Sequence, residues 1–359
     1  MAQVESFDTS GFPSRIGCEV RGLALESASE PRPGRAALLA AAAGRQALAQ
    51  AGLAGTEVSL SIGTTMGESC WLEAWDPADV RSGAVRAEEL VRSGPDQVGR
   101  DVASELGLGG RVVVLAGACA AGNYALGHAL DLVRLGRADA VLAGGTDAFS
   151  RVAFTGFARL GALAAEACRP FSADRDGLVL GEGAAMLVVE SATAAAARGA
   201  ESLAELAGIG LSGDAFHIVS PDLQGRGATR AMEAALEDAG AERGEIGYLS
   251  AHGTGTPAND RAEVAAARAV FGRNGPPMSS IKSITGHGLG AASALEAVAC
   301  VQALREQIAP PTWNFTRPDP ECDWDAIPNE PRELELGVVV SNAYDFGGAN
   351  ASLVLRAAG

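Results

Sequence analysis

The sequence predicts an α/β protein made of two successive β/α sets. Short apolar runs alternate with alanine-rich helical runs through residues 36–198, and a second alternation of similar size begins near residue 203. Strands that alternate with helices indicate parallel or mixed sheets covered on both faces. A chain of 359 residues is long for one core and suits one large or two fused α/β domains. We therefore expect an N-terminal half over residues 1–203 and a C-terminal half over residues 204–359.

The first set follows a mixed stretch at 1–35 that contains Gly and Pro and shows no long period. Its predicted elements are helix 36–51, strand 58–62, strand 111–115, helix 120–135, strand 138–143 ending in two glycines, strand 183–190 and helix 192–198. Runs such as Val112–Leu115 are apolar throughout, which is typical of strands buried on both faces.

The second set shows the same alternation of strands and helices. Its predicted elements are strand 204–210, helix 226–239, strand 246–250, helix 261–271, strand 278–282, helix 290–307 and two final strands, 337–342 and 351–355. No short-period repeat is present, so the two halves are expected to be related by architecture rather than by a sequence repeat.

Composition excludes several classes of function. The net charge of −16 argues against nucleic acid, which requires a basic footprint. No run of 18 apolar residues is present, so no membrane span is expected, and the first residues do not resemble a signal peptide. Six scattered cysteines without a C-x-x-C pair predict neither zinc nor a redox motif, and they indicate a reducing cytoplasm.

Cys119 is a candidate nucleophile. A buried strand leads into Gly117-Ala-Cys-Ala-Ala-Gly122, a tight turn of small residues, and a helix follows at once. The sulfur is therefore expected near a helix N-terminus, where free N–H groups favour the thiolate and lower the pKa of the thiol. The alternative is a small buried cysteine that only fills the turn.

Two of the four histidines, His252 and His287, lie in Gly-rich loops that follow predicted strands. Such loops are where α/β proteins place ligand contacts, although a single histidine there is more often structural. Lys282, the only lysine in the chain, lies five residues before His287. Glu296 on the next helix could reach back to Lys282, keep it charged and help to orient His287; the alternative is a solvated surface pair of little value.

Other polar residues flank these loops. Asp260 and Glu263 could support the loop that carries His252 or serve the N-terminus of the following helix. Near the end of the chain, residues 341–350 form a predicted turn between two strands. Its paired glycines, Gly347 and Gly348, could present a backbone N–H to a substrate carbonyl, or the turn could be an ordinary hairpin.

Taken together, six segments resemble the β-ketoacyl-[acyl-carrier-protein] synthases, the elongating ketosynthases of fatty acid and polyketide synthesis. They occur in the family's order and spacing, from about residue 6 to the end of the chain: Gly-Ala-Cys119-Ala-Ala-Gly, Ala-Gly-Gly145-Thr-Asp-Ala, the segment 169–183, His252-Gly-Thr-Gly-Thr256-Pro, Lys282-Ser-Ile-Thr-Gly-His287 and Phe346-Gly-Gly-Ala-Asn350. The resemblance implies the thiolase fold, in which two pseudo-duplicated halves form a layered αβαβα core.

The resemblance also implies a role for each matching residue. Cys119 looks like the acyl-accepting nucleophile, and His252 and His287 look like the two active-site histidines. Lys282 matches the lysine that supports the second histidine, and Glu296 its carboxylate partner. Phe346 matches the gating phenylalanine, whose backbone N–H joins that of Cys119 in the oxyanion hole. The implied substrate contacts come from the phosphopantetheine-binding positions Thr254 and Thr256, the acyl-pocket position Met66, and the gate residues Tyr344 and Asp345.

The implied reaction has two halves: acyl transfer to Cys119, then decarboxylative condensation with malonyl carrier protein. No metal or organic cofactor is implied, because the phosphopantetheine belongs to the acyl carrier protein. The implied assembly is a homodimer through residues 111–115 or a heterodimer with a ketosynthase-like partner, and Arg198 matches a basic docking position. The alternatives are an acyltransferase or malonyl decarboxylase on the same fold and a non-catalytic subunit like a chain length factor. A thiolase is disfavoured because its second-cysteine motif is not seen.

The chain departs from the family pattern in two places. The family normally opens with a strand well before the Phe7-Asp8 region, and that strand has no match here, which predicts a bare strand edge or a misassigned start. The family gate usually reads Phe-Gly-Phe-Gly-Gly, whereas this chain has Tyr344-Asp345-Phe346-Gly-Gly. Asp345 replaces a glycine and brings a carboxylate near a site for malonate, so we expect a specialised gate.

Overall fold

The structure is a computed structural model, and it describes residues 1–27, 29–74, 81–83 and 87–358. Each half of the chain contributes one sheet. The first sheet has the order β4-β3-β5-β6, built from β3 (Ser59–Gly63), β4 (Val112–Leu115), β5 (Ala140–Asp147) and β6 (Gly183–Glu190). The second has the order β7-β13-β12-β8-β9, built from β7 (Ala204–Gly213), β8 (Ile246–Ser250), β9 (Met278–Ser279), β12 (Val338–Tyr344) and β13 (Ala349–Ala357).

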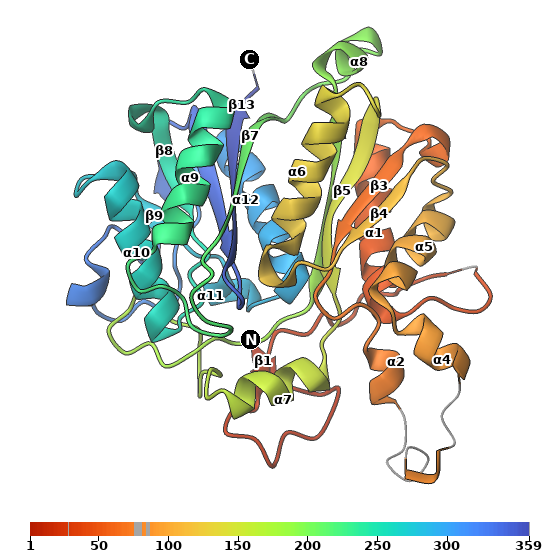
Figure 1. The fold of residues 1–359 in the computed structure, drawn as a ribbon, viewed down its shortest axis with the longest axis horizontal. Helices are drawn as coiled ribbons and strands as arrows, with labels where there is room; N and C mark the ends of the chain where they lie inside the picture. The colour runs from red at the N-terminus through yellow and green to blue at the C-terminus, as the bar shows by residue number, and fades with distance from the viewer. Residues whose placement is uncertain (28, 75–80, 84–86, 359) are drawn as a thin grey trace.

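Helices cover both sheets, so the molecule has five layers (Figure 1). The middle layer, between the sheets, is formed by α6 (Ala121–Arg134) and α12 (Ala292–Glu306), which contact each other and strands of both sheets. The outer layers are formed by α1 (Arg35–Ala51) with α5 (Pro95–Leu106), and by α9 (Arg226–Ala239) with α10 (Pro257–Phe271). The layered αβαβα architecture predicted from the sequence is therefore confirmed.

The two sheets correspond strand by strand, with one exception. In the first, β3 runs parallel to β4 and β5, and β6 is antiparallel to β5. In the second, β8 runs parallel to β9 and β12, and β13 is antiparallel to β12. The fifth strand, β7, adds to the far side of β13 and has no counterpart in the first sheet. Within the described residues, no strand pairs with the outer edge of β6.

Small residues allow the central layers to approach closely. A Cβ placed on Gly122 of α6 would lie 2.7 Å from the backbone nitrogen of Ala294 on α12, so this crossing requires glycine. Close crossing by Ala and Gly fits the composition, in which aromatic residues make up only 5%. The helix that follows Cys119 is thereby fixed against the helix that carries Glu296.

Several elements differ from the sequence-based expectation. The strand predicted at 278–282 ends at Ser279, and Lys282–Thr285 forms a short helix, α11, because the chain turns there toward the site. Strand β5 runs through its two glycines to Asp147.

The remaining short elements are β1 (Ala2–Gln3) paired with β2 (Ile16–Gly17), β10 (Ile308–Ala309) paired with β11 (Arg332–Glu333), α2 (Cys70–Glu73), α4 (Ala87–Arg92), α7 (Arg151–Arg159) and α8 (Ala192–Ala197).

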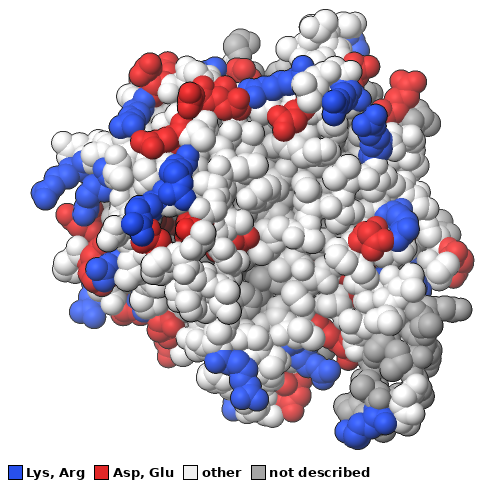
Figure 2. Space-filling view, in the orientation of Figure 1, with Lys and Arg blue, Asp and Glu red and all other residues white. Residues whose placement is uncertain are grey.

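The surface carries a mixture of charges. Figure 2 shows arginines interspersed with Asp and Glu around the rim of one face, whose centre bears few charged groups. The only lysine, Lys282, is buried, so the basic surface is made by arginine alone. In the part of the chain that the structure describes, no helix has the length and apolar character needed to cross a bilayer.

Candidate active site

Cys119 lies in the turn that joins β4 to α6. The single turn of 3-10 helix Ala118–Ala120 precedes α6, and Ala118 has a left-handed backbone (φ 48°) that redirects the chain. The side chain is buried, with 7% of the residue exposed. Burial raises the pKa of the thiol to about 12, Asp345 adds to the rise and Lys282 opposes it. The lowered pKa expected from the helix N-terminus is therefore wrong for this closed site, because loss of solvent dominates.

The ring of His287 contacts the sulfur directly. Its Nε2 lies 3.1 Å from the Cys119 Sγ, and its Nδ1 accepts a hydrogen bond from the backbone N–H of Leu289 at 3.2 Å. A neutral imidazole whose Nδ1 accepts must carry its proton on Nε2. Burial lowers the pKa of His287 well below its ordinary value, which keeps the ring neutral. The Nε2–H therefore faces the sulfur.

His252 lies beside His287, with the ring centroids 5.5 Å apart. Its backbone N–H and that of Gly253 donate to the two carboxylate oxygens of Glu263, at 2.8 and 2.7 Å. Burial first, and then the charge of Lys282, lowers the pKa of His252 well below its ordinary value. The site thus holds two adjacent neutral imidazoles, one of which contacts the cysteine.

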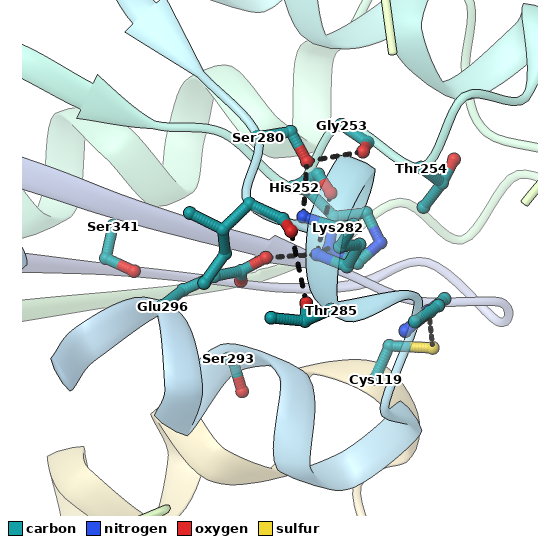
Figure 3. A network of polar contacts seen from close by, with 12 residues as sticks. Cys119, His252, Gly253, Thr254, Ser280, Lys282, Thr285, Ser293, Glu296 and Ser341 are labelled. Carbon is teal, nitrogen blue, oxygen red and sulfur yellow. Dashed lines mark hydrogen bonds and ion pairs between the residues drawn. The ribbon is translucent and has the colours of Figure 1, made fainter. Parts of the chain in front are cut away.

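Lys282 connects His252 to Glu296 (Figure 3). Its ammonium donates to the His252 carbonyl oxygen at 2.7 Å, lies 3.3 Å from the His252 Nδ1 and forms a buried ion pair with Glu296. Burial raises the pKa of Glu296, and the ammonium opposes this rise. The expected support of His287 by Lys282 is wrong: α11 directs the lysine toward the loop of His252, and His287 takes its hydrogen bond from Leu289 instead.

The loop after His252 is held by a second buried carboxylate. Asp260, in the first turn of α10, accepts the backbone N–H groups of Gly255 at 3.2 Å and Phe171 at 2.8 Å. Thr254 and Thr256 face each other, with 2.9 Å between their hydroxyl oxygens. Asp260 therefore supports the loop, as one of the two expectations had it, and its carboxylate caps no N–H group of α10.

The gate segment lies at the end of β12. The ring of Phe346 is 5.7 Å from that of Phe157 on α7, and Phe157 is 6.5 Å from the ring of His287. Phe346 remains 39% exposed. Tyr344 is buried, and its ring lies 5.8 Å from that of His252. The gate thus borders both histidines.

Asp345 fits the gate without a left-handed backbone. The positive φ angles of this turn belong to Gly347 (99°) and Gly348 (79°), so the backbone constraint expected at Asp345 does not arise. Its Oδ1 accepts the N–H of Ala349 at 2.6 Å, which closes the turn on itself. Burial first, and then nearby Asp214, raises the pKa of Asp345 to about 7.

Family models match both halves of the chain. Residues 26–195 match the N-terminal domain of β-ketoacyl synthase, and residues 203–316 match its C-terminal domain. The chain belongs to the β-ketoacyl synthase family. It is accordingly a condensing enzyme of the acyltransferase class, of the kind used in fatty acid and polyketide synthesis.

Relatives of this synthase extend over almost its whole length. It is 43% identical to nodulation protein E of Rhizobium meliloti (strain 1021), covering 96% of this chain and 89% of the relative. It is 39% identical to 3-oxoacyl-[acyl-carrier-protein] synthase 2 of Coxiella burnetii, covering 98% and 90%.

Solved structures show the same fold. The ishigamide ketosynthase/chain length factor matches with a TM-score of 0.94 and 40% identity, over 100% of this chain and 92% of that one. A type II polyketide synthase acyl-carrier protein in complex with its ketosynthase bound to the hexaketide matches with a TM-score of 0.91 and 31% identity, over 100% and 92%.

Two features of the synthase site were not predicted from the sequence. Asp147, at the end of β5, accepts four hydrogen bonds from loops that border the site, and Leu289 donates to His287. An aspartate shortly after the predicted strand 138–143 and its two glycines was the available signal for the first. Met66 packs partly buried beside Phe149, Phe154 and Leu289. Among the described residues, no group of three or more His, Cys, Asp or Glu could hold a metal ion.

Proposed function

We propose that Cys119 is the acyl-accepting nucleophile of this synthase and that His252 and His287 together stabilise the enolate formed from a malonyl thioester. The observation that carries the proposal is the geometry of the three side chains. The His287 Nε2 lies 3.1 Å from the Cys119 Sγ, and the His252 ring lies 5.5 Å from the His287 ring. Both rings are buried and neutral, and hydrogen-bond donors act most strongly where solvent is excluded.

In the first half-reaction, the Cys119 sulfur attacks the carbonyl carbon of an acyl thioester on a carrier protein. The oxyanion of the tetrahedral intermediate would be held by the backbone N–H groups of Cys119 and Phe346, as the family resemblance implies. The bond to the carrier sulfur then breaks, and the proton of the cysteine thiol ends on the departing carrier thiol. Acyl-Cys119 remains.

In the second half-reaction, a malonyl thioester loses CO₂, and the electrons of the broken C–C bond form an enolate. The enolate oxygen would accept hydrogen bonds from the Nε2–H groups of His252 and His287. The enolate carbon attacks the acyl-Cys119 carbonyl, the C–S bond breaks and the Cys119 thiolate takes up a proton. The product is a β-ketoacyl thioester on the carrier.

The proposed partners are an acyl carrier protein, which brings the phosphopantetheine arm, and a second ketosynthase-like chain, identical or not. No further cofactor is proposed. In the described part of the chain, β4 pairs with β3 alone, and Val112 on this edge strand is 39% exposed, which supports pairing across a dimer axis. Arg198 gives little support as a docking residue, because Glu190 already binds its guanidinium at 2.6 and 2.8 Å. Six free cysteines support the expected cytoplasmic location.

The test is intact-protein mass spectrometry after incubation with acyl carrier proteins and then with malonyl carrier protein. We expect an acyl adduct that malonyl carrier protein discharges as β-ketoacyl carrier. Cys119→Ala should abolish the adduct, whereas the matched control Cys322→Ala, another buried cysteine, should retain it. An adduct that is never discharged as a β-ketoacyl product would replace the proposal with simple acyl transfer. Loss of CO₂ from malonyl carrier protein without any adduct would replace it with malonyl decarboxylation.

The intact nucleophile opposes a role as a non-catalytic subunit like a chain length factor. A subunit that only shapes the pocket of a partner needs neither a cysteine in contact with a histidine nor a buried lysine. Here Cys119 contacts His287, Lys282 contacts His252, and the two rings lie 5.5 Å apart. A Cys119→Ala variant that kept full activity together with a partner chain would restore that alternative.

A further inference from the structure

The carboxylate of Asp147 is saturated with hydrogen-bond donors. Its Oδ1 accepts the Thr64 hydroxyl and the Met66 backbone N–H, both at 2.8 Å. Its Oδ2 accepts the backbone N–H groups of Thr65 at 2.8 Å and Gly290 at 2.7 Å. Asp147 is fully buried. Only a carboxylate offers four acceptor positions in so small a group, so the residue type follows from the donors that converge on it.

One of these donors belongs to the loop that orients His287. Gly290 follows Leu289, and Leu289 adopts a left-handed backbone (φ 52°) that costs a non-glycine residue free energy. In this conformation the Leu289 N–H points at the His287 Nδ1. The bond from Gly290 to Asp147 holds the next peptide in place. The conformation that sets the His287 tautomer is thus fixed one residue away.

The packing around Gly290 shows how tightly this loop is seated. A Cβ on Gly290 would lie 2.8 Å from the Asp147 Oδ2 and equally close to the Cα of Thr64 and the nitrogen of Thr65. A Cβ on Gly288 would meet nothing closer than 3.5 Å. The loop therefore rests on Asp147 at Gly290 and has room at Gly288.

We propose that Asp147 is a positioning residue for the condensation step, holding the Leu289–Gly290 peptide so that His287 keeps its proton on Nε2 and its ring against Cys119. The inference rests on the proposed function, since it concerns the same histidine. Asp147 contacts no reacting atom; it acts through the loop. A purely structural anchor would instead stabilise the fold without affecting the state of His287.

Two variants and two controls separate these roles. Asp147→Asn keeps the shape but brings two N–H donors into a nest of four donors, so the loop shifts. Gly290→Ala keeps the carboxylate and displaces the loop from the other side. Gly288→Ala is its matched control, because the added methyl group fits. Glu182→Gln is the structural control: Glu182 is a buried carboxylate of the same half that accepts the N–H groups of Val20 and Phe149 at 2.8 and 2.9 Å.

Each variant is measured in three ways at pH 8. Before these measurements, the rate of acyl-Cys119 formation is followed, so that a variant whose Cys119 no longer reacts is identified. The first measurement is kcat and KM for malonyl carrier protein with the acylated enzyme. The second is the thermal midpoint. The third is the ¹⁵N spectrum of labelled histidine, which reports the tautomer of each imidazole. With only four histidines, His287 can be assigned from the spectrum of His287→Ala.

We expect Asp147→Asn and Gly290→Ala to lower kcat by about 10²-fold with KM changed less than threefold, since a displacement of about 1 Å has costs of this size. The His287 signal should lose its single Nε2–H form in both. Gly288→Ala should leave all three readouts unchanged, and Glu182→Gln should lower only the thermal midpoint.

Two outcomes would overturn the inference. One is an unchanged His287 tautomer in Asp147→Asn. The other is a fall in kcat no larger than that of Glu182→Gln at an equal loss of thermal midpoint. If Asp147→Asn does not fold, Gly290→Ala decides by the same criteria. If wild-type enzyme forms no acyl-Cys119, the proposed function fails, while the tautomer measurement still tests the contact between Asp147 and the histidine loop.

Discussion

The ammonium of Lys282 lies 2.7 Å from the carbonyl oxygen of His252 and 3.3 Å from its Nδ1. His287, the other ring of the site, receives its hydrogen bond at Nδ1 from the backbone of Leu289. In both imidazoles the donor is at Nδ1, but in His252 it is the side chain of Lys282 and in His287 it is a backbone N–H. The proton of each ring is then on Nε2, which in His287 faces the Cys119 Sγ at 3.1 Å, and only His252 has a side chain as the direct donor to its Nδ1.

Replacing this lysine should affect decarboxylation more than acylation. In Lys282→Met, the His252 Nδ1 loses its donor and its ring is free to change tautomer, so one of two enolate donors is lost. We expect malonyl decarboxylation to fall by about 10²–10³-fold, the effect of removing one such donor. The measurement is CO₂ release by acylated enzyme, with the rate of acyl-Cys119 formation as the internal control. Equal losses in both half-reactions would contradict this assignment.

The Lys282–Glu296 pair should make stability non-additive. Glu296→Ala leaves a buried ammonium without its counter-charge, and we expect a loss of about 3–5 kcal/mol in the free energy of unfolding. The double variant Lys282→Met with Glu296→Leu removes both charges and should cost less than Glu296→Ala alone. Urea titration measures each value. Glu233→Ala, which breaks the exposed Arg243–Glu233 pair, is the control and should cost no more than about 1 kcal/mol.

The activity of the two histidines should persist below the ordinary pKa of imidazole. Burial lowers the pKa of both His252 and His287 well below 6.5, so both remain neutral donors as pH falls through that value. We expect no inflection assignable to these rings near pH 6.5 in the pH–rate profile of malonyl decarboxylation. An inflection there that His252→Ala removes would show that the ring is charged in the free enzyme.

The same shifts fix the sign of their contribution to stability. Above pH 6.5 neither the folded nor the unfolded histidines bind a proton, so the shifts cost nothing. Below pH 6.5 the histidines of the unfolded chain bind protons, whereas those of the folded chain stay neutral. The free energy of unfolding should therefore fall as pH decreases. His252→Ala should reduce this dependence on pH between about 6.5 and 5, as measured by urea titration.

Asp345 should influence both the thiol and the choice of acyl chain. Its carboxylate raises the pKa of Cys119, so Asp345→Asn should shift the pH midpoint of Cys119 alkylation by iodoacetamide downward. Asp345→Gly should also release the turn bond to Ala349 and change the acyl-chain preference. Asp214→Asn is a comparison variant: it removes the charge that raises the pKa of Asp345 but leaves the bond from Ala349 to Asp345 in place. Asp214 also contacts the same hairpin, because it accepts the side-chain N–H of Asn350 at 2.8 Å. Identical chain profiles for Asp345→Gly and wild type would remove the idea of a specialised gate.

Most of the fold could be predicted from the sequence, because strands and helices leave local patterns of apolar and small residues. Composition alone identifies the apolar runs of β4 and β12 and the alanine-rich helix α1. It also identifies the small-residue turn at Cys119. The short strand β9 was overestimated, since the turn into Lys282–Thr285 depends on contacts with distant loops rather than on propensity.

The sequence predicted which residues form the site better than it predicted which of them contact one another. Residue types and spacing pointed to Cys119, Lys282 and both histidines, but the partner of Lys282 depends on where α11 points in space. The pKa of Cys119 also depended on something the sequence does not display, the exclusion of solvent by both halves of the chain. Asp147 was overlooked for the same reason, since its donors come from positions more than 80 residues away on either side.

The difference between the two sheets should be visible in hydrogen–deuterium exchange. Strand β13 has β12 on one side and β7 on the other, so its amides alternate between two sets of acceptors and should all exchange slowly. Among the residues that the structure describes, strand β6 pairs with β5 alone, and every second amide along Gly183–Glu190 points away from β5. Those amides should carry deuterium within seconds, so fast and slow amides should alternate along β6, whereas every amide of β13 should be slow.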